Sequence, residues 1–356
     1  MADFRANDTI VTKFLLDTCR VDRQLNVDAL QASFDCYWFT TYPRWAVVDD
    51  ETEIIPLISG SVDELYIQPL LSCVGDVDVM YHRSDLLAIP AGTAPPTQLP
   101  DKFHSRVEVL EIVDSEFPGY VYLMSSYLLT EYTDDGKYSA VQCQRRYMAH
   151  RPKRDNKMHG PSCTLEHGSL VCGHLARSHL SHSRLAGSHL STDIVYCIRC
   201  LSWLSQAADW PTRHRNYHWP DSATVDRVVS NGCDLVQVAH RRCRQDEWMS
   251  NHQRRLSFSR AEIVLINSWI PVQQIVYHML RVFVKIERLT DSANNPDAAT
   301  LSNYHIKTLM LWACELKPRS WWIDDLNVVK LSVELLHTLG VWLTDARCPH
   351  YFHPQL

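Results

Sequence analysis

Hydrophobic residues recur at two different spacings along this 356-residue chain. In residues 4–37 apolar side chains return every three to four positions without Pro or Gly, which predicts a long N-terminal helix. In residues 106–150 the alternating run RVEVLEIV, the run YVYLM and the turn TDDGKY predict strands and a hairpin. Further along, TDIVYCIRC at 192–200 predicts another strand.

The helical spacing returns from about Arg255 to the C-terminus. Pro271 and the segment SANNPDA separate the helical runs. A mixed α/β first part and an all-helical second part predict an α+β protein with two domains, residues 1–250 and 251–356. Four runs carry the helical pattern: RAEIVLINSW, VQQIVYHMLRVFVKIERL, YHIKTLMLWACEL and DDLNVVKLSVELLHTLGVWLTDA.

Residues 151–192 are rich in Gly, Ser and His and predict a long loop. Its histidines could bind a metal ion. The absence of a nearby Cys or acid cluster at fixed spacing favours a loop without a ligand. These histidines are His167, His174, His179, His182 and His189.

Composition places few limits on function. Hydrophobic residues are 46% and charged residues 21%, as in an ordinary globular protein. No run of about 18 apolar residues and no signal peptide are present, so we expect a cytoplasmic location and no membrane partner. The twelve cysteines are scattered through the chain and are expected to be reduced. Because the net charge is −6, any nucleic-acid surface must be a local patch.

Paired aspartates in GDVDVM suggest metal chemistry. In a strand, Asp76 and Asp78 would face the same way with Cα atoms ~6.5–7 Å apart, which suits Mg²⁺. Alone, the pattern is weak evidence, because most such pairs are solvated acids at the end of a strand. The Gly60-Ser61 turn upstream could grip a phosphate, and a turn followed by D-x-D is the layout of polymerase-β-like nucleotidyltransferases. Such enzymes use two metals and need a third acid on a neighbouring strand.

Asp193, at the start of TDIVYCIRC, is the candidate third acid, with an ordinary strand-end residue as the alternative. The alternation of this strand puts Cys197 and Cys200 on opposite faces. That arrangement argues against a zinc site at Cys197-x-x-Cys200, which also lacks a second ligand pair.

Several later stretches resemble the cyclic GMP–AMP synthase and Mab-twenty-one superfamily: QRRLSFSRAE, LSNYHIKTLMLWACE and CPHYFHPQL, together with GDVDVM, DIVYCIRC, DWP and GCDLVQVAHR. They run in family order from residue 60 to the C-terminus. The nearest likeness is to the cyclic GMP–AMP synthase-like receptors, which sense nucleic acid and make cyclic dinucleotides. The resemblance implies a bilobal polymerase-β-like fold with a mixed-sheet core lobe, a long N-terminal helix and a C-terminal helical lobe.

The resemblance also implies roles for individual residues. It makes Asp76, Asp78 and Asp193 the catalytic acids and the ligands of two Mg²⁺ or Mn²⁺ ions, with no structural zinc. The tyrosine of Asn303-Tyr304 would stack on a nucleobase, and here Asn replaces the usual Ser. Without the motif, Tyr304 would be an ordinary core aromatic and Ser257 and Ser259 would be helix N-caps. The implied nucleotide-binding residues are Gly60, Ser61, Arg255, Ser257, Ser259, Glu262, Arg281, Asn303 and Tyr304.

Members of this superfamily are usually switched on by nucleic acid. DNA-sensing members carry a His/Cys zinc thumb after the R-L-S-F-S stretch, whereas residues 262–300 here contain one His and no Cys. The sequence therefore resembles RNA-sensing members, and double-stranded RNA is the expected activator. The basic residues expected to contact it are Lys13, Arg20, Arg23, Arg145, Arg146, Arg151, Lys153, Arg154, Lys157, Arg241, Arg242 and Arg244.

The leading hypothesis is therefore an enzyme that joins two NTPs into a cyclic dinucleotide when double-stranded RNA binds. Two alternatives stay open. The protein could be a catalytically silent Mab-twenty-one-type regulatory or scaffold protein, or it could synthesise linear oligonucleotides.

Overall fold

The computed structural model describes residues 54–59, 77–132, 136–150, 158–159, 162–165, 192–244, 247–287, 301–323 and 328–353. The predicted N-terminal helix, the Gly60-Ser61 turn, Asp76 and the five histidines of the predicted loop lie outside these residues. Two short strands, at 158–159 and 162–165, fall within 151–192, where only a loop was predicted.

Ten strands of the described residues form one mixed sheet. The first strand pairs antiparallel with the second, the second pairs parallel with the third and the eighth, and the remaining pairs are antiparallel. The strands are β1 (Ile54–Ser59), β2 (Val77–Pro90), β3 (Arg106–Asp114), β4 (Tyr120–Glu131), β5 (Tyr138–Tyr147), β6 (Met158–His159), β7 (Ser162–Leu165), β8 (Thr192–Cys200), β9 (Cys233–Val236) and β10 (Arg254–Ser257).

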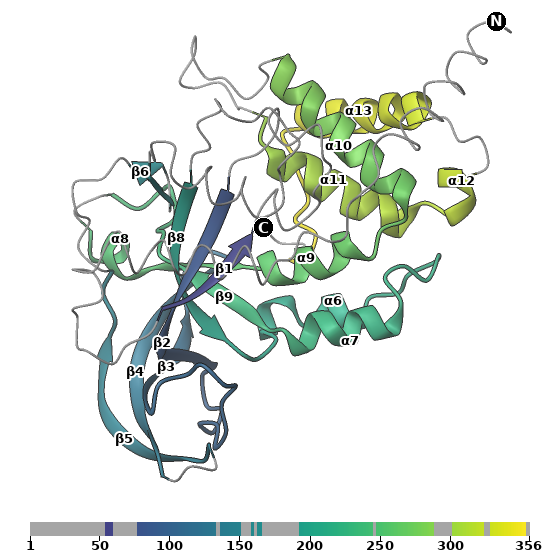
Figure 1. Ribbon diagram of the computed structural model, residues 1–356. Helices are drawn as coiled ribbons and strands as arrows, with labels where there is room; N and C mark the ends of the chain where they lie inside the picture. The colour runs from purple at the N-terminus through teal and green to yellow at the C-terminus, as the bar shows by residue number, and fades with distance from the viewer. Residues whose placement is uncertain are drawn as a thin grey trace, which may run out of the picture.

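The long strand β2 closes this sheet. Its first half is flanked by β1 and β8, and its second half pairs with β3. The path β2–β3–β4–β10–β9–β8 therefore returns to β2 and makes a barrel-like ring (Figure 1). The mixed sheet was predicted, but its closure was not.

Most helices lie on one side of the sheet and continue away from it, whereas the short helix at Trp248–His252 lies on the other side (Figure 1). None among the described residues is both long and apolar enough to cross a membrane. The helices are η1 (Ser205–Ala207), α6 (Asp209–Thr212), α7 (Ser222–Ser230), α8 (Trp248–His252), α9 (Ser259–Asn267), α10 (Pro271–Ile286), α11 (Asn303–Leu316), α12 (Arg319–Ile323) and α13 (Val328–Thr344).

These elements confirm the strands predicted within 106–150, the strand 192–200 and the four C-terminal helical runs. Pro271, expected between helices, is the first residue of α10, where its missing N–H costs no hydrogen bond. The α+β class is confirmed. The bilobal arrangement and the boundary at residue 250 stay predictions.

The alternation predicted for β8 is visible in its packing. Cys197 packs with Met80 and Val236, whereas Cys200 belongs to a larger cluster on the other face. That cluster runs without interruption from the sheet through α7 and α9 to the C-terminal helices α10, α11 and α13. The sheet and the described helices therefore share one hydrophobic core.

A buried carboxylate fastens the end of the chain to this core. Glu315 on α11 accepts hydrogen bonds from Arg213 Nη2 at 2.7 Å and from the Tyr351 hydroxyl at 2.7 Å. Arg215 Nε lies 3.6 Å from the same oxygen. The Arg213 guanidinium also stands over the Trp312 ring, 4.5 Å from its centre. One acid thus joins the loop after α6, helix α11 and the C-terminal segment.

We expect the substitution Glu315→Gln to lower the free energy of unfolding by about 3 kcal/mol, because two largely buried guanidinium groups lose their counter-charge. Urea denaturation measures the change. Glu334→Gln on the exposed side of α13 is the control and should shift stability by no more than ~0.5 kcal/mol. Equal effects from both substitutions would show that Glu315 does not fasten the C-terminal segment.

Candidate functional site

The backbone register places two of the predicted acids opposite each other. β2 and β8 are parallel neighbours, and Asp78 is the Cα partner of Asp193. Ser59, the last residue of β1 and the one before the Gly60-Ser61 turn, is the partner of Asp78 on the other side. Adjacent strands lie about 4.8 Å apart, which suits two acids that share metal ions. The strand of Asp193, the predicted third acid, is therefore the neighbour of the strand that carries Asp78.

The role of these acids stays a prediction. Asp76 lies outside the described residues, and only the backbone is described at Asp78 and Asp193. Among the side chains that the structure does describe, no three His, Cys, Asp or Glu residues are grouped to hold a metal ion.

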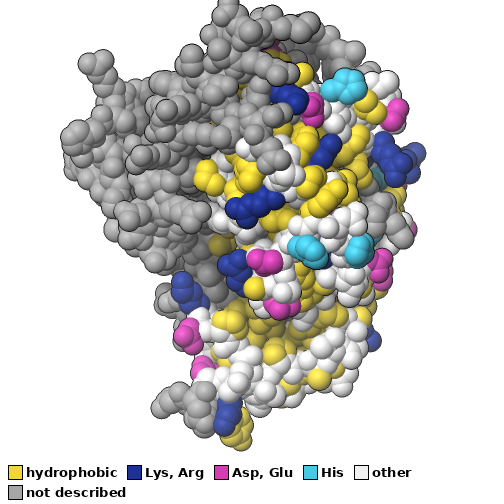
Figure 2. Space-filling view, turned by 90° about the vertical axis from the view of Figure 1, so that its right-hand side faces the viewer, with side chains coloured by type: hydrophobic (Ala, Val, Ile, Leu, Met, Phe, Trp, Pro, Cys, Tyr) yellow, Lys and Arg dark blue, Asp and Glu magenta, His cyan; other side chains and the backbone are white. Residues whose placement is uncertain are grey.

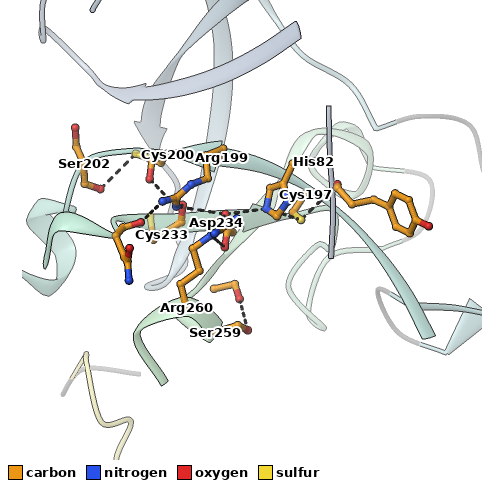
Figure 3. A network of polar contacts seen from close by, with 12 residues as sticks. His82, Cys197, Arg199, Cys200, Ser202, Cys233, Asp234, Ser259 and Arg260 are labelled. Carbon is orange, nitrogen blue, oxygen red and sulfur yellow. Dashed lines mark hydrogen bonds and ion pairs between the residues drawn. The ribbon is translucent and has the colours of Figure 1, made fainter. Parts of the chain in front are cut away.

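A buried polar network lies further along the same strands (Figure 3). Its centre is Asp234 on β9, whose side chain is 0% exposed. Asp234 Oδ1 lies 2.9 Å from His82 Nε2, and Arg260 Nε donates to Oδ2 at 3.0 Å. Arg199 Nη1 stands 3.5 Å from Oδ1. The network therefore joins β2, β8, β9 and helix α9.

The network keeps Asp234 ionised. Burial alone would raise the pKa of this carboxyl, but the hydrogen bond with His82 and the charges of His82, Arg260 and Arg199 outweigh burial and lower it. Cys197 Sγ is 3.2 Å from His82 Nε2, and burial followed by the Asp234 charge raises the pKa of this thiol well above its usual range. Cys197 is thus a neutral thiol rather than a nucleophile.

This network lies on the same pair of strands, β2 and β8, as Asp78 and Asp193. His82 is the partner of Cys197, four positions beyond the Asp78–Asp193 pair, or ~13 Å along the strands. Arg199 is in turn the partner of Asp234 across β8 and β9. The network therefore holds together the strand pair that carries the acids.

A second group of predicted residues meets where β10 passes into α9. The Ser257 and Ser259 hydroxyl oxygens are 3.0 Å apart, and Phe258 rather than a serine is the N-cap of α9. Arg255 is exposed on β10. Among the described residues, no ion pair engages the Arg255 side chain. Hydroxyl and guanidinium donors are thus available at one strand–helix junction.

Tyr304 lies in the first turn of α11 and is 39% exposed. Its hydroxyl end is the buried end, and burial followed by the nearby Glu262 carboxylate raises its pKa. Glu262 on α9 accepts a hydrogen bond from Lys307 Nζ at 2.9 Å. The partly exposed ring of Tyr304 fits base stacking better than it fits the alternative of a core aromatic. Lys307, one turn beyond Tyr304, was not predicted.

His350 in the C-terminal segment links these two helix starts. Its ring centre is 5.9 Å from that of Tyr304 and 6.0 Å from that of Phe258. The backbone N–H groups of Phe352 and His353 both donate to His350 Nδ1, at 3.2 and 3.1 Å. Nδ1 therefore carries no proton, and the neutral ring has its N–H at Nε2. Burial, followed by the charges of His353 and Arg255, lowers the pKa of His350 to about 4.

Sequence reasoning missed His350, because CPHYFHPQL was used only for its family likeness. Two closely spaced histidines beside aromatic residues near the chain end were the available signal. A pattern of this kind does not show which residues the two histidine rings contact.

The other two predicted nucleotide ligands are placed differently. Asn303 is exposed as the first residue of α11, after the capping box of Ser302 and His305. Arg281 is only 3% exposed, on α10, with its guanidinium 5.4 Å from the centre of the Tyr277 ring. Among the described residues, no hydrogen bond, ion pair or ring contact joins Arg281 to Arg255, Ser257 or Tyr304.

Five of the predicted nucleic-acid ligands belong to the described part of the chain. Arg145 on β5 pairs with Glu111 at 2.7 Å, and Arg146 with Glu108 at 3.8 Å. Arg241, Arg242 and Arg244 are exposed. Lys13, Arg20, Arg23, Arg151, Lys153, Arg154 and Lys157 lie outside the described residues.

Comparisons with known proteins agree with this geometry. A family profile described as the Mab-21 protein nucleotidyltransferase domain matches residues 143–268. A second, described as the Mab-21 protein HhH/H2TH-like domain, matches residues 273–356. Together they cover more than half of the chain, which therefore belongs to the Mab-21 family of the cyclic GMP–AMP synthase and Mab-21 superfamily and carries a nucleotidyltransferase-type domain.

Curated relatives carry the same family name. The chain is 31% identical over 175 residues to a protein mab-21-like of Aedes aegypti, 29% over 175 residues to one of Anopheles gambiae and 30% over 168 residues to one of Drosophila melanogaster. These matches cover 46%, 47% and 46% of this chain and 42%, 43% and 43% of the relatives. The chain thus matches less than half the length of each relative.

The substitution Asp234→Asn should lower the free energy of unfolding by about 3 kcal/mol, because Arg199 and Arg260 would keep their charges without the buried counter-charge. Chemical denaturation with a tryptophan fluorescence readout measures this. Asp226→Asn on the exposed side of α7 should change stability by at most ~0.5 kcal/mol. A loss no larger than that of the control would contradict the organising role of Asp234.

Stability should also depend on His350. Its folded-state pKa of about 4 lies below the ordinary 6.5, so the unfolded chain takes up a proton first as the pH falls. The protein therefore loses stability through His350 from about pH 7 down to about pH 4. The variant His350→Asn keeps an acceptor for the two backbone amides without this titration, so its melting temperature should fall less steeply over that range. Parallel curves for the two proteins would contradict the proposed neutral His350, and His337→Asn on exposed α13 is the control.

Proposed function

We propose that this chain joins two NTPs into a cyclic dinucleotide second messenger for innate immune signalling when double-stranded RNA binds to it. The observation that carries the proposal is the register of Asp78 and Asp193 on adjacent parallel strands of a nucleotidyltransferase-type domain. The group of Ser257, Ser259, Tyr304 and His350 supports it, because it offers phosphate donors beside an exposed aromatic ring.

The reaction follows from these positions. Asp76, Asp78 and Asp193 would hold two Mg²⁺ or Mn²⁺ ions, which activate the attacking hydroxyl and neutralise the triphosphate. A ribose hydroxyl oxygen of one NTP attacks the α-phosphorus of the other, and pyrophosphate leaves. A second attack within the linear dinucleotide closes the ring and releases a second pyrophosphate.

The chain's own residues position the nucleotides. The Tyr304 ring stacks on a base, which contributes ~1–3 kcal/mol per base. Arg255 supplies fixed donors to a base edge, and the Ser257 and Ser259 hydroxyls donate to phosphate oxygens. The Asp234 network keeps β2 and β8 in register beneath the acids. Positioning of this kind is the main contribution of the protein in phosphoryl transfer.

RNA would switch the enzyme on through a basic surface. The described part of the helical face does not offer one, because it mixes Lys and Arg with Asp, Glu and hydrophobic side chains and has no patch of a single charge (Figure 2). The exposed Arg241, Arg242 and Arg244 follow β9 in the sequence. Contacts with phosphates predict RNA affinity that falls steeply with salt.

Two alternatives use the same fold. One is a catalytically silent Mab-21-type regulatory or scaffold protein. A linear oligonucleotide synthase would use the same acids without ring closure.

One experiment separates these functions. The purified chain is incubated with the four NTPs and Mg²⁺ or Mn²⁺, with or without long double-stranded RNA or DNA, and the products are treated with phosphatase. The proposal predicts an RNA-dependent product that resists phosphatase. Phosphatase-sensitive ladders would instead identify a linear synthase, and no product under any condition would favour the silent alternative.

The substitution Asp193→Asn should reduce product formation at least ~100-fold, because a ligand of the ions that stabilise the transition-state charge is lost. RNA binding should be unchanged, as measured by fluorescence anisotropy. The exposed Asp226→Asn on α7 serves as the activity control. Full activity of the Asp193 variant would show that the third acid is misassigned.

A further inference from the structure

Aromatic side chains from β4, β5 and helix α8 form a row on one face of the sheet. Tyr120 and Tyr122 are two residues apart on β4 and so face the same way. The Tyr120 ring meets His240 edge-on at 5.1 Å, and the Tyr122 ring lies 5.1 Å from Trp248. Helix α8 thus packs its first residue against the row.

The outer part of this row is open to solvent. Trp248 is 47% exposed and Tyr147 on β5 is 43% exposed, with ring centres 5.0 Å apart. His252 stacks on Trp248 at 4.2 Å with an interplanar angle of 14°. We call Tyr122, Tyr147, Trp248 and His252 the aromatic shelf. Clustered exposed aromatic rings of this kind typically mark a binding surface.

Basic residues flank the aromatic shelf on two sides. Arg145 on β5 pairs with Glu111, and Glu111 and Tyr147 are both register partners of Met124, so Arg145 reaches the same face of the sheet. Arg241 and Arg242 follow His240, whose pKa is lowered by burial and then by these two positive charges. The nearby Glu116 accepts hydrogen bonds from the Tyr122 hydroxyl and Gln253 Nε2. Arg145 is paired with Glu111, whereas Arg241 and Arg242 form no ion pair among the described residues. These two arginines can therefore contact an anion beside the shelf.

One residue contacts both His150 and His240. The Gln253 backbone carbonyl contacts the His150 ring. Gln253 Oε1 accepts a hydrogen bond from the backbone N–H of His240 at 2.8 Å. His150 immediately precedes the basic run that begins at Arg151, and His240 immediately precedes Arg241. Segments about ninety residues apart in the sequence thus converge beside α8.

The aromatic row also reaches Arg255, one of the predicted nucleotide-binding residues. Tyr120 is the register partner of Arg255 across β4 and β10, and cross-strand partners share a face of the sheet. A nucleic-acid strand bound along the aromatic row would therefore lie on the same face of the sheet as Arg255.

The chemistry of the shelf identifies its occupant. Aromatic faces beside arginines suit unpaired bases, whose rings stack while the guanidinium groups pair with the phosphates. A regular duplex hides its base faces within the helix and cannot stack on Trp248. We propose that the aromatic shelf binds a single-stranded segment of RNA, such as an unpaired end or loop of the activating duplex. The choice of RNA rests on the RNA-triggered function proposed above.

Binding of fluorescein-labelled oligonucleotides without NTPs tests this proposal, so its outcome does not depend on catalysis. The probes are a 15-nucleotide single-stranded RNA, a blunt RNA duplex and a single-stranded DNA of the same sequence. The variant Trp248→Leu keeps apolar bulk but removes the stacking face, and we expect ~10-fold weaker binding of single-stranded RNA. Trp248→Phe should bind within ~3-fold of the wild type, because it restores an aromatic face.

The controls distinguish stacking from charge and from folding. Tyr132→Leu removes an aromatic ring that is 77% exposed at the far end of β4 and should leave RNA binding unchanged. Trp248→Leu should not alter the salt dependence of binding, whereas Arg241→Gln and Arg242→Gln should each reduce the slope by about 1. Thermal melting checks that each variant is folded, and Tyr147→Ser must repeat the loss if Trp248→Leu is unstable.

Three results would overturn the proposal. The first is a folded Trp248→Leu variant that binds single-stranded RNA as tightly as the wild type does. The second is a Trp248→Leu variant that loses as much affinity for the blunt duplex as for single-stranded RNA. The third is a wild-type protein that binds the single-stranded DNA more tightly than the single-stranded RNA. If RNA binds as expected but no nucleotide product forms, the shelf assignment stands and the proposed enzymatic function fails.

Discussion

The structure depends on how a single buried carboxylate is satisfied. Asp234 has no exposed surface, so its charge is tolerable only because His82, Arg199 and Arg260 surround it. Those three partners come from β2, β8 and α9, which the carboxylate holds to β9. The same contacts join β2, β8 and β9 where the β2–β8 pairing closes the sheet into a ring, on the strand pair where Asp78 is the register partner of Asp193. A polar interaction in the core thus determines where the candidate acids stand.

The C-terminal segment completes the arrangement from the helical side. Tyr351 is fastened to Glu315 and Arg213, and the neighbouring His350 lies between Tyr304 and Phe258. The start of α11 and the β10–α9 junction are therefore held together by residues at the end of the chain. A nucleotide group built in this way requires the sheet and the helices to be packed as one core, which the continuous hydrophobic cluster provides.

Much of the local structure was predictable from the sequence, because spacing reflects which face a residue presents. The alternation in TDIVYCIRC correctly separated Cys197 from Cys200, and the three-to-four spacing found α9, α10, α11 and α13. Partners distant in sequence were not predictable. His82 and Asp234 are 152 residues apart in the sequence, and no motif around either residue indicates that the two are in contact.

The candidate site shows the same division. Two carboxylates on strands could be proposed from a D-x-D pattern and a strand start, and their register agrees with that proposal. The convergence of His150 and His240 on Gln253 depends on how β4, β5 and α8 pack, which local pattern does not encode. The central claim is tested most directly by a crystal structure with Mn²⁺ and a non-hydrolysable NTP. Anomalous scattering should place Mn²⁺ between the Asp78 and Asp193 carboxylates with a base on Tyr304, and Mn²⁺ or nucleotide bound elsewhere would contradict the account.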